Sequence, residues 1–265
     1  MAPPALRGRR VLLVEDNELN RFVATELLAD VAGMDVALAG SGQEALTLLR
    51  GAAFDLVLMD IQMPGMDGLQ ATRLIRADPA LARLPVIAMT AHAMAADRDK
   101  SREAGMNDHV AKPFEPAQLF EVMLRWLAPV CADGVAGAPA SPGHAGAGPL
   151  LDVELGLRRC LGREELYRKI LGRYLKQRAA TGNEARTALA AGEIETAARS
   201  AHTLVSTAST IGAPALADLA RELHAAIDEG APERWPALLE RMDALQREVD
   251  AAVTEYMATP ERAPS

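Results

Sequence analysis

An Ala-, Gly- and Pro-rich segment at residues 129–149 divides the 265-residue chain into two parts with different patterns. The segment reads PVCADGVAGAPASPGHAGAGP and shows no periodic spacing of apolar residues. Such a composition is typical of a flexible linker, because it offers no apolar face that a fold could bury. We therefore predict two domains, at 1–128 and 150–258, each with its own core, and a disordered tail at 259–265.

Short apolar runs alternate with helix-like stretches through the first part of the chain. This alternation predicts a five-stranded parallel sheet with helices on both faces, the doubly wound, flavodoxin-like α/β class. The third run, FDLVLMD, is apolar on both faces, as a central parallel strand should be. Ser41 and Glu44 predict a capping box at the start of a helix. The expected strands are Val11–Val14, Asp35–Ala39, Leu56–Met59, Val86–Met89 and His109–Ala111.

The second part of the chain contains helical patterns and no convincing strand. One pattern has apolar residues at spacings of 4, 3, 4 and 3, namely Ala197, Ala201, Leu204, Ala208 and Ile211. Such a spacing predicts a seam that is buried in an antiparallel four-helix bundle. The expected helices are 152–160, 163–179, 183–190, 193–211, 213–228 and 233–256.

Composition excludes several classes of function. The formal net charge of -8 leaves no basic face for nucleic-acid phosphates. Two cysteines, Cys131 and Cys160, are too few for a disulfide framework, so we expect a reducing, cytoplasmic location. No apolar run approaches 18 residues, so membrane insertion of this chain is not expected. No glycine-rich ATP-binding motif is present, and we do not expect an enzyme that uses ATP.

Acidic, hydroxyl and basic residues follow the predicted strands of the first domain. Glu15 and Asp16 come after the first strand, Asp60 after the third, Thr90 after the fourth and Lys112 after the fifth. Carboxylates that converge at one sheet edge repel each other unless a cation lies among them, and oxygen ligands suit Mg²⁺. A carboxylate nucleophile beside a metal, a lysine and a hydroxyl indicates phosphoryl transfer onto an aspartate.

Four segments of the first domain resemble the receiver domain of two-component signalling, over about residues 10–127. They are VLLVEDN, FDLVLMDIQMPGMDG, PVIAMTA and AGMNDHVAKPF. The spacings of 44 residues from Asp16 to Asp60, 30 to Thr90 and 22 to Lys112 fit that family. The resemblance implies that Asp60 accepts a phosphoryl group, which Thr90 and Lys112 contact. It also implies that Mg²⁺ is held by the side chains of Glu15, Asp16 and Asp60 and by the backbone carbonyl of Gln62.

Two positions qualify this interpretation. The aromatic switch position of the family, three residues before the lysine, is His109 in this chain, which departs from the family pattern of an aromatic rotamer switch. A phosphatase with an aspartyl nucleophile is an alternative in a related α/β fold. Such enzymes use a second carboxylate two residues after the nucleophile as a general acid, and Gln62 cannot do that chemistry. Gln62 therefore argues against the phosphatase alternative.

His202 lies one residue past Ala201 on the predicted seam, about 100° around the helix from the core. Its flanking residues are small or polar, which leaves a ring nitrogen accessible to another protein. His224 occupies a similar flanking position and is interpreted as an ordinary helix histidine. The run ARSAHTLVSTASTIGAPAL, with its upstream helices, resembles a histidine phosphotransfer (HPt) domain over about residues 150–256. That resemblance implies that His202 carries phosphate on an imidazole nitrogen.

The chain departs from the HPt pattern just after the histidine. The usual Lys-Gly, three and four residues on, is Val205-Ser206 here, and Arg199 is a nearby cation that can partly replace the lysine. An active phosphoacceptor and a docking-only relic are both open at this point. In the first case the chain is a phosphorelay protein, resembling the C-terminal part of a hybrid sensor kinase. Its partners are then an upstream histidine kinase and the receiver domain of another response regulator. The direction of phosphate flow, and whether transfer is within or between chains, are open.

Overall fold

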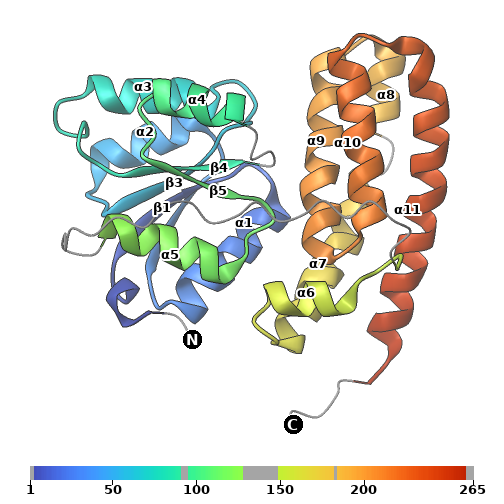
Figure 1. Ribbon diagram of the computed structural model, residues 1–265, viewed down its shortest axis with the longest axis horizontal. Helices are drawn as coiled ribbons and strands as arrows, with labels where there is room; N and C mark the ends of the chain where they lie inside the picture. Colours follow the sequence, from blue (N-terminus) through green and yellow to red (C-terminus); the bar gives the residue numbers. More distant parts are fainter. Residues whose placement is uncertain (1–2, 91–94, 128–148, 182–183, 261–265) are drawn as a thin grey trace. The chain divides into compact units, whose positions relative to one another are not determined.

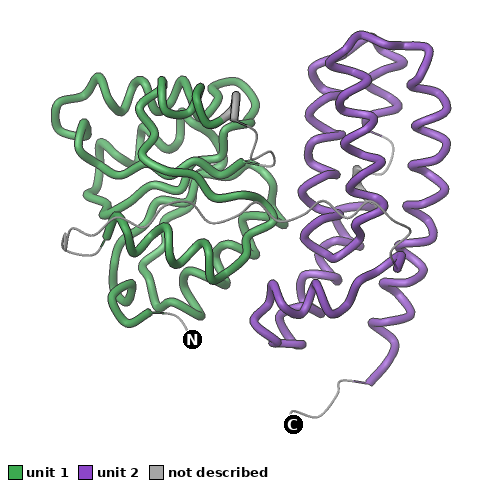
Figure 2. Tube along the Cα trace, in the orientation of Figure 1, with its two compact units in different colours: residues 1–143 green, residues 144–265 purple. Residues whose placement is uncertain are grey.

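The computed structural model describes residues 3–90, 95–127, 149–181 and 184–260. The chain divides into two units, residues 1–143 and 144–265, which are coloured separately in Figure 2. The division falls inside the linker predicted at 129–149, nearly all of which lies outside the described residues. The predicted tail begins with the described residues Thr259 and Pro260, and 261–265 lie outside them.

Unit 1 holds a five-stranded sheet in the order β2-β1-β3-β4-β5, and every neighbouring pair of strands is parallel. The prediction of a doubly wound α/β fold is confirmed. The two strands β3 and β4 are buried along their whole length, which explains why their sequences are apolar on both faces. The strands are β1 Arg10–Val14, β2 Asp35–Ala39, β3 Leu56–Asp60, β4 Val86–Thr90 and β5 Asp108–Ala111.

Helices cover both faces of this sheet. In Figure 1, α1 and α5 lie on one face, and α2, α3 and α4 lie on the other. A short 3₁₀ turn, Pro4–Leu6, precedes β1, and a π-helical turn, Glu26–Val31, continues α1. The helices are α1 Glu18–Thr25, α2 Gly42–Gly51, α3 Gly68–Ala77, α4 Ala95–Glu103 and α5 Pro116–Leu127.

The capping box predicted at the start of α2 is half right. Ser41 Oγ accepts a hydrogen bond from the Glu44 N–H at 3.2 Å, as predicted. The Glu44 carboxylate, however, accepts from the N–H of Gly40 at 2.7 Å instead of from the N–H of Ser41. The glutamate therefore satisfies a donor one residue earlier than a capping box requires, and both side chains still stabilise the first turn.

Unit 2 is an all-helical bundle, as predicted. The α9 helix packs against α7, α8 and α10, and α11 packs against α7 and α10. In Figure 1 the long helices α9, α10 and α11 lie alongside one another, with the short α6 near one end of the bundle. A 3₁₀ turn, Pro232–Arg234, precedes α11. The helices are α6 Val153–Arg159, α7 Glu164–Thr181, α8 Glu184–Ala191, α9 Ile194–Ile211, α10 Pro214–Asp228 and α11 Trp235–Ala258.

The buried seam of α9 differs from the predicted one at two positions. Leu204 is only half-buried, whereas Val205, which is not part of the predicted seam, is 3% exposed. Ser206 is also 3% exposed. The reason is that α9 has neighbours on several sides, and a helix in that position buries a wider arc than a single seam.

Polar and steric contacts join α6 and α7 to the end of α9. The Tyr167 hydroxyl donates to the carbonyl of Ile211 at 2.8 Å, and the Asp152 N–H donates to the carbonyl of Gly212 at 2.7 Å. Gly212 ends α9 with φ +83°, and a Cβ there would lie 2.4 Å from the Asp152 carbonyl oxygen. Glycine is thus required at this helix end for both backbone conformation and space. Within the described residues, no helix has the length and hydropathy needed to span a membrane.

Candidate phosphoacceptor sites

Three carboxylates meet at the carboxyl edge of the sheet in unit 1. Glu15 and Asp16 follow β1 directly, and Asp60 is the last residue of β3. Because β1 and β3 are parallel neighbours, their carboxyl ends lie side by side. Each of the three residues offers a carboxylate oxygen, and these atoms all lie within 4.8 Å of one another. The chain therefore brings together the three acidic residues that the sequence placed at this edge.

Lys112, just after β5, supplies a cation to two of these carboxylates. Its Nζ lies 2.6 Å from Asp60 Oδ2 and 2.6 Å from Glu15 Oε2. All three side chains are at most 4% exposed, so the ammonium offsets the charge of carboxylates that water cannot solvate. The Lys112 N–H donates to the Thr90 carbonyl at 2.7 Å, which holds the ends of β4 and β5 together.

The other oxygen of Glu15 is held by the start of α1. Glu15 Oε1 accepts from Asn20 Nδ2 at 3.2 Å and from the Asn17 N–H at 3.3 Å. Asn17 also caps α1, because its Oδ1 accepts from the Asn20 N–H at 3.0 Å. Arg21 adds a hydrogen bond to the Glu15 carbonyl at 2.9 Å. Sequence reasoning missed these three supporting residues, although the Asn-x-x-Asn spacing at a helix start was a usable signal.

The electrostatics of the site are those of crowded, buried acids. Burial raises the pKa of Glu15 to about 7, with a further increase from Asp60 and an opposing effect of Lys112. Burial also raises the pKa of Asp60, against the effect of Lys112, and raises the pKa of Asp16, with Glu15 adding to it. Burial alone would lower the pKa of Lys112, but Asp60 and Glu15 outweigh it and raise that pKa. The single positive charge of Lys112 therefore does not balance the negative charge of the three carboxylates.

This donor set fits a hard divalent cation. The cluster contributes only carboxylate oxygens, and Mg²⁺ prefers oxygen ligands and is commonly held by one or two carboxylates with waters. One lysine faces two buried acids, and Asp16 is a third acid beside them, so a bound cation would relieve the repulsion that raises these pKa values. The residues present thus suit Mg²⁺ by their chemistry and by their charge.

The backbone around Asp60 leaves no spare space. The Gln62 N–H donates to Asp60 Oδ1 at 3.2 Å, which orients the carboxylate. Gly68, the first residue of α3, packs on the same strand end: a Cβ there would lie 2.0 Å from the Asp60 carbonyl oxygen. Gly68 was missed by sequence reasoning, although a glycine directly after a helix-capping aspartate was a signal of close approach. The helix α3 can therefore approach Asp60 only because position 68 has no side chain.

Two further predicted positions lie on β4 and β5. Thr90, the last residue of β4, is 8% exposed at the same edge of the sheet. His109, in β5, is half-buried, and its Nδ1 lies 3.6 Å from Asp108 Oδ1. Burial lowers the pKa of His109, with Arg98 as the next cause. Asp108 also accepts from Trp126 Nε1 at 3.1 Å, so His109 lies next to a strand–helix contact with α5.

The candidate residue of unit 2 is not isolated. His202 is half-buried on α9, and its ring lies 5.7 Å from the ring of His224 on α10, at 55° between the ring planes. The Nδ1 atom of His224 lies 3.4 Å from Asp228 Oδ2, one turn further along α10. Sequence reasoning treated His224 as an ordinary helix histidine. Sequence reasoning did not show that one flank of α9 faces one flank of α10, the helix joined to it by the short turn at Gly212.

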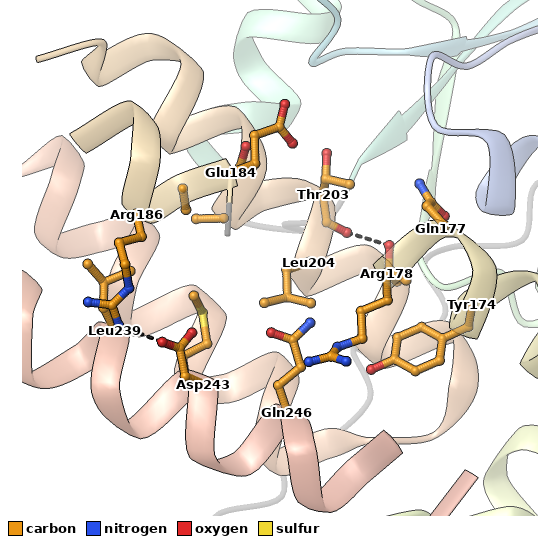
Figure 3. Close-up of a pocket in the computed structure, with 15 residues that line it drawn as sticks. Tyr174, Gln177, Arg178, Glu184, Arg186, Thr203, Leu204, Leu239, Asp243 and Gln246 are labelled. Atoms are coloured by element: carbon orange, nitrogen blue, oxygen red, sulfur yellow. Dashed lines mark hydrogen bonds and ion pairs between the residues drawn. The ribbon is translucent and has the colours of Figure 1, made fainter. Parts of the chain in front are cut away.

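A separate pocket lies between α7, α8, α9 and α11 (Figure 3). Arg186 pairs with Asp243 at 2.5 Å across it, and Arg178 pairs with Asp250. The α9 residues that line this pocket include Thr203 and Leu204, which Figure 3 labels, and His202 is not among the lining residues. The pocket is therefore distinct from the surface on which His202 and His224 meet.

Comparisons with known proteins agree with this division of the chain. Residues 11–124 match the family model of the response regulator receiver domain, and residues 169–255 match that of the Hpt domain. The polar-differentiation response regulator DivK of Brucella ovis is 38% identical over 119 residues, which cover 45% of this chain and 96% of DivK. The chain belongs to the response regulator receiver family. Its receiver domain is followed by an Hpt domain, so both modules are those of a two-component phosphorelay.

Relatives also match this chain across both modules. The sensor protein GacS of Pseudomonas syringae pv. syringae is 35% identical over 256 residues, which cover 95% of this chain. The chain spans only 28% of the length of GacS. Among solved structures, the receiver domain of the sensor histidine kinase PA1611 of Pseudomonas aeruginosa, with magnesium in its active-site cleft, is 41% identical. It covers 46% of this chain and 99% of its own, with a TM-score of 0.44.

Proposed function

We propose that Asp60 accepts a phosphoryl group from the phosphohistidine of a histidine kinase, and that His202 exchanges this group with a receiver aspartate. The observation that carries the proposal is the contact of Lys112 with Asp60 within a cluster of three carboxylates at one sheet edge. A nucleophilic carboxylate with a fixed cation and oxygen ligands for a metal is the equipment that phosphoryl transfer needs.

In the transfer to Asp60, a carboxylate oxygen attacks phosphorus while the bond from phosphorus to the donor imidazole nitrogen breaks, and the imidazole leaves with a proton. Lys112 already contacts Asp60, so it is in place to pair with the oxygens of the incoming phosphoryl group. Thr90 lies at the end of the adjacent strand β4, where we assign its hydroxyl to the same oxygens. The Gln62 N–H keeps the carboxylate oriented.

Mg²⁺ is the proposed cofactor, held by Glu15, Asp16 and Asp60 and by the backbone carbonyl of Gln62. When bound, it supplies positive charge that offsets the developing charge on the phosphoryl oxygens. Lys112 forms its ion pairs with Glu15 and Asp60, so Asp16 is the carboxylate of the cluster that Lys112 neutralises least.

In unit 2, an imidazole nitrogen of His202 attacks the phosphorus of an aspartyl phosphate, and the bond from phosphorus to the carboxylate oxygen breaks. The Hpt domain provides the nucleophile, and the docked receiver provides the acidic pocket and metal. We propose that the chain takes its phosphoryl group from a kinase partner and passes it to a receiver partner without using ATP itself. We also propose a cytoplasmic location, which the buried free thiol of Cys160 supports.

A docking module with an inactive Hpt domain is the second candidate. It is favoured by the residue at position 205, where the Hpt family usually has lysine: the valine there is apolar and buried and supplies no cation. In this alternative Asp60 is phosphorylated and His202 only forms part of a surface.

The experiment is phosphosite mapping by intact-mass and peptide mass spectrometry. The chain is incubated with Mg²⁺ and acetyl phosphate beside Asp60→Asn and His202→Gln variants. Label on Asp60 that later reaches His202, and is absent from His202 in the Asp60→Asn variant, supports the relay. Label confined to Asp60, even after addition of partner receivers carrying phosphate, favours the docking module. No label on Asp60 in the presence of Mg²⁺ overturns the proposal for unit 1.

A further inference from the structure

The pocket between α7, α8, α9 and α11 takes no part in the proposed phosphoryl transfer, and His202 is not among its lining residues (Figure 3). It has an empty volume of about 630 Å³, part of which is open to solvent. Sites for small molecules commonly have volumes of about 300–1,000 Å³. The lining residues Tyr174, Gln246 and Thr207 are 1%, 5% and 6% exposed, so the pocket extends into the interior of the bundle.

Much of the pocket lining is apolar. Leu204 comes from α9, and Leu239 and Met242 come from α11. Ala185 on α8 and Ala201 on α9 also line the pocket, and both are buried. Because the side chain of alanine is only a methyl group, these two positions leave space that a larger side chain would fill. The pocket therefore suits a ligand with an apolar body, which gains free energy by leaving water.

The other part of the lining is a network of polar side chains. The Tyr174 hydroxyl donates to Asp250 at 3.2 Å, and the side chain of Gln246 hydrogen-bonds to the same hydroxyl. Arg178 forms an ion pair with Asp250. Asp250 is not among the lining residues, so it holds both Tyr174 and Arg178 from outside the pocket. These contacts fix the polar groups of the lining before a ligand arrives, as in most small-molecule sites.

Within this network, Arg178 keeps one donor without an acceptor. Its Nε atom is buried and has no hydrogen-bond partner among the described residues, whereas its Nη1 atom pairs with Asp250. A buried N–H without an acceptor is unfavourable, because it has lost its hydrogen bond to water. Guanidinium groups only donate, so the group that satisfies Nε must be an acceptor. Since Arg178 lines the pocket, an oxygen atom of a bound molecule can fill this role.

The charges of the lining favour an uncharged acceptor. Arg178 is paired with Asp250, and Arg186 is paired with Asp243 at 2.5 Å across the pocket. Glu184, which also lines the pocket and is exposed, adds a negative charge. A carboxylate ligand would therefore meet two acids, Asp243 and Glu184, and two arginines that already have acidic partners. A carbonyl oxygen accepts a hydrogen bond without adding a charge.

We infer that this pocket binds an uncharged small molecule with an apolar body and a carbonyl group, whose oxygen accepts a hydrogen bond from Nε of Arg178. The apolar body packs against Leu204, Leu239 and Met242. Such a ligand contacts side chains from four helices, so its binding stabilises unit 2. Binding is non-covalent and does not depend on phosphorylation of the chain.

The test uses the full chain and three small probes that share a phenyl ring. Benzamide has an uncharged carbonyl group, benzoate has a charged carboxylate, and toluene has no comparable acceptor. Carbon-13 labelling of the methionine methyl groups gives an NMR signal for Met242, which is assigned by its loss in a Met242→Leu variant. Benzamide should shift this signal saturably, with a dissociation constant of about 1 mM for a probe of this size. Benzoate and toluene should bind at least about fivefold more weakly.

Two variants locate the probe and its hydrogen bond. Arg178→Lys keeps a positive charge that can pair with Asp250 but has no Nε–H, so benzamide should bind about tenfold more weakly and toluene equally well. Ala185→Leu fills the pocket, so neither probe should shift the Met242 signal. The matched control is Arg168→Lys, which changes another ion-paired arginine of α7 that does not line the pocket and should leave benzamide affinity unchanged. Circular dichroism should show equal helix content in these variants.

The three probes on the parent chain decide the inference even where a variant does not fold. No shift of the Met242 signal at about tenfold above the expected dissociation constant would show that water alone fills the pocket, and would overturn the inference. Toluene or benzoate binding at least as tightly as benzamide would overturn it as well. So would equal weakening of benzamide by Arg178→Lys and Arg168→Lys. A preference for benzamide that Arg178→Lys abolishes supports the hydrogen bond, whether or not the chain carries phosphate.

Discussion

The Nζ atom of Lys112 lies 2.6 Å from Asp60 Oδ2 and equally close to Glu15 Oε2, and all three groups are buried. A buried charge that loses its partner is costly, because water does not replace the lost contact. The ammonium is therefore a structural part of the resting receiver as well as a group assigned to the phosphoryl oxygens.

Replacing Lys112 by Met should lower the free energy of unfolding of the metal-free receiver by about 3–5 kcal/mol. Saturating Mg²⁺ should recover part of the loss, since a cation among the carboxylates replaces part of the missing charge. Urea unfolding of the full chain, with and without Mg²⁺, measures both effects. Lys100→Met, at an exposed position of α4, serves as control and should change stability by less than about 0.5 kcal/mol. Similar losses from the two substitutions would contradict the argument.

Replacing Asp16 by Asn should raise the melting temperature without metal and reduce the increase that Mg²⁺ produces. Without Mg²⁺ the substitution removes repulsion with Glu15, which contributes to the raised pKa of Asp16, so the melting temperature should rise. The increase in melting temperature that Mg²⁺ produces should fall sharply, because one of the proposed ligands is lost. Differential scanning fluorimetry with EDTA and with Mg²⁺ measures the pair of values. Asp30→Asn, at an exposed position, should preserve the Mg²⁺ response.

Replacing Gly68 by Ala should displace the end of β3. The added Cβ would lie 2.0 Å from the Asp60 carbonyl oxygen, so either α3 or the strand end must move. We expect a loss of stability of about 1–3 kcal/mol, as for overpacked cores, and slower labelling of Asp60 by acetyl phosphate. Gly51→Ala is the matched control, because nothing lies within 4 Å of a Cβ at that helix position. Normal labelling of the Gly68→Ala variant would refute the steric argument.

His109 should make receiver stability fall at mildly acid pH. Burial lowers the pKa of His109 in the folded state, so below the ordinary histidine pKa of 6.5 the unfolded state binds more protons. The contribution of His109 to the free energy of unfolding is therefore complete above pH 6.5. It is lost as the pH falls from 6.5 through the lowered pKa of the folded state. Urea unfolding at pH 7.5 and 5.5 should show a smaller decrease for His109→Phe than for the parent. An equal decrease in both would rule out this residue as the source.

Replacing Tyr167 by Phe should destabilise unit 2 by about 1–3 kcal/mol, because the Ile211 carbonyl loses a buried donor. Tyr174→Phe is a useful comparison: its hydroxyl donates at 3.2 Å to Asp250, which also pairs with Arg178 and so keeps a partner. The loss at Tyr174 should be smaller. Chemical denaturation followed by the far-ultraviolet signal of the helices measures both; the reverse order of losses would contradict the prediction.

Much of unit 1 could be predicted because local pattern and connectivity agree there. The apolar runs ending at Val14 and Met59 can be buried on both faces only as inner strands of a parallel sheet. Parallel connectivity then brings Glu15, Asp16 and Asp60 to one edge, whatever the details of side-chain packing. Supporting contacts such as that of Asn20 with Glu15 were not predictable, because they depend on the exact angle at which α1 leaves the strand.

In unit 2 the sequence alone determined the helices and the presence of a histidine beside a buried seam. It did not determine that Val205 points inward or that His224 meets His202. The physical reason is the difference between the two kinds of structure. Hydrogen bonds between strands set a sheet register residue by residue, whereas the rotation of a helix depends on how side chains from several neighbouring helices pack together. Only the tertiary structure decides which flanks of α9 and α10 face each other.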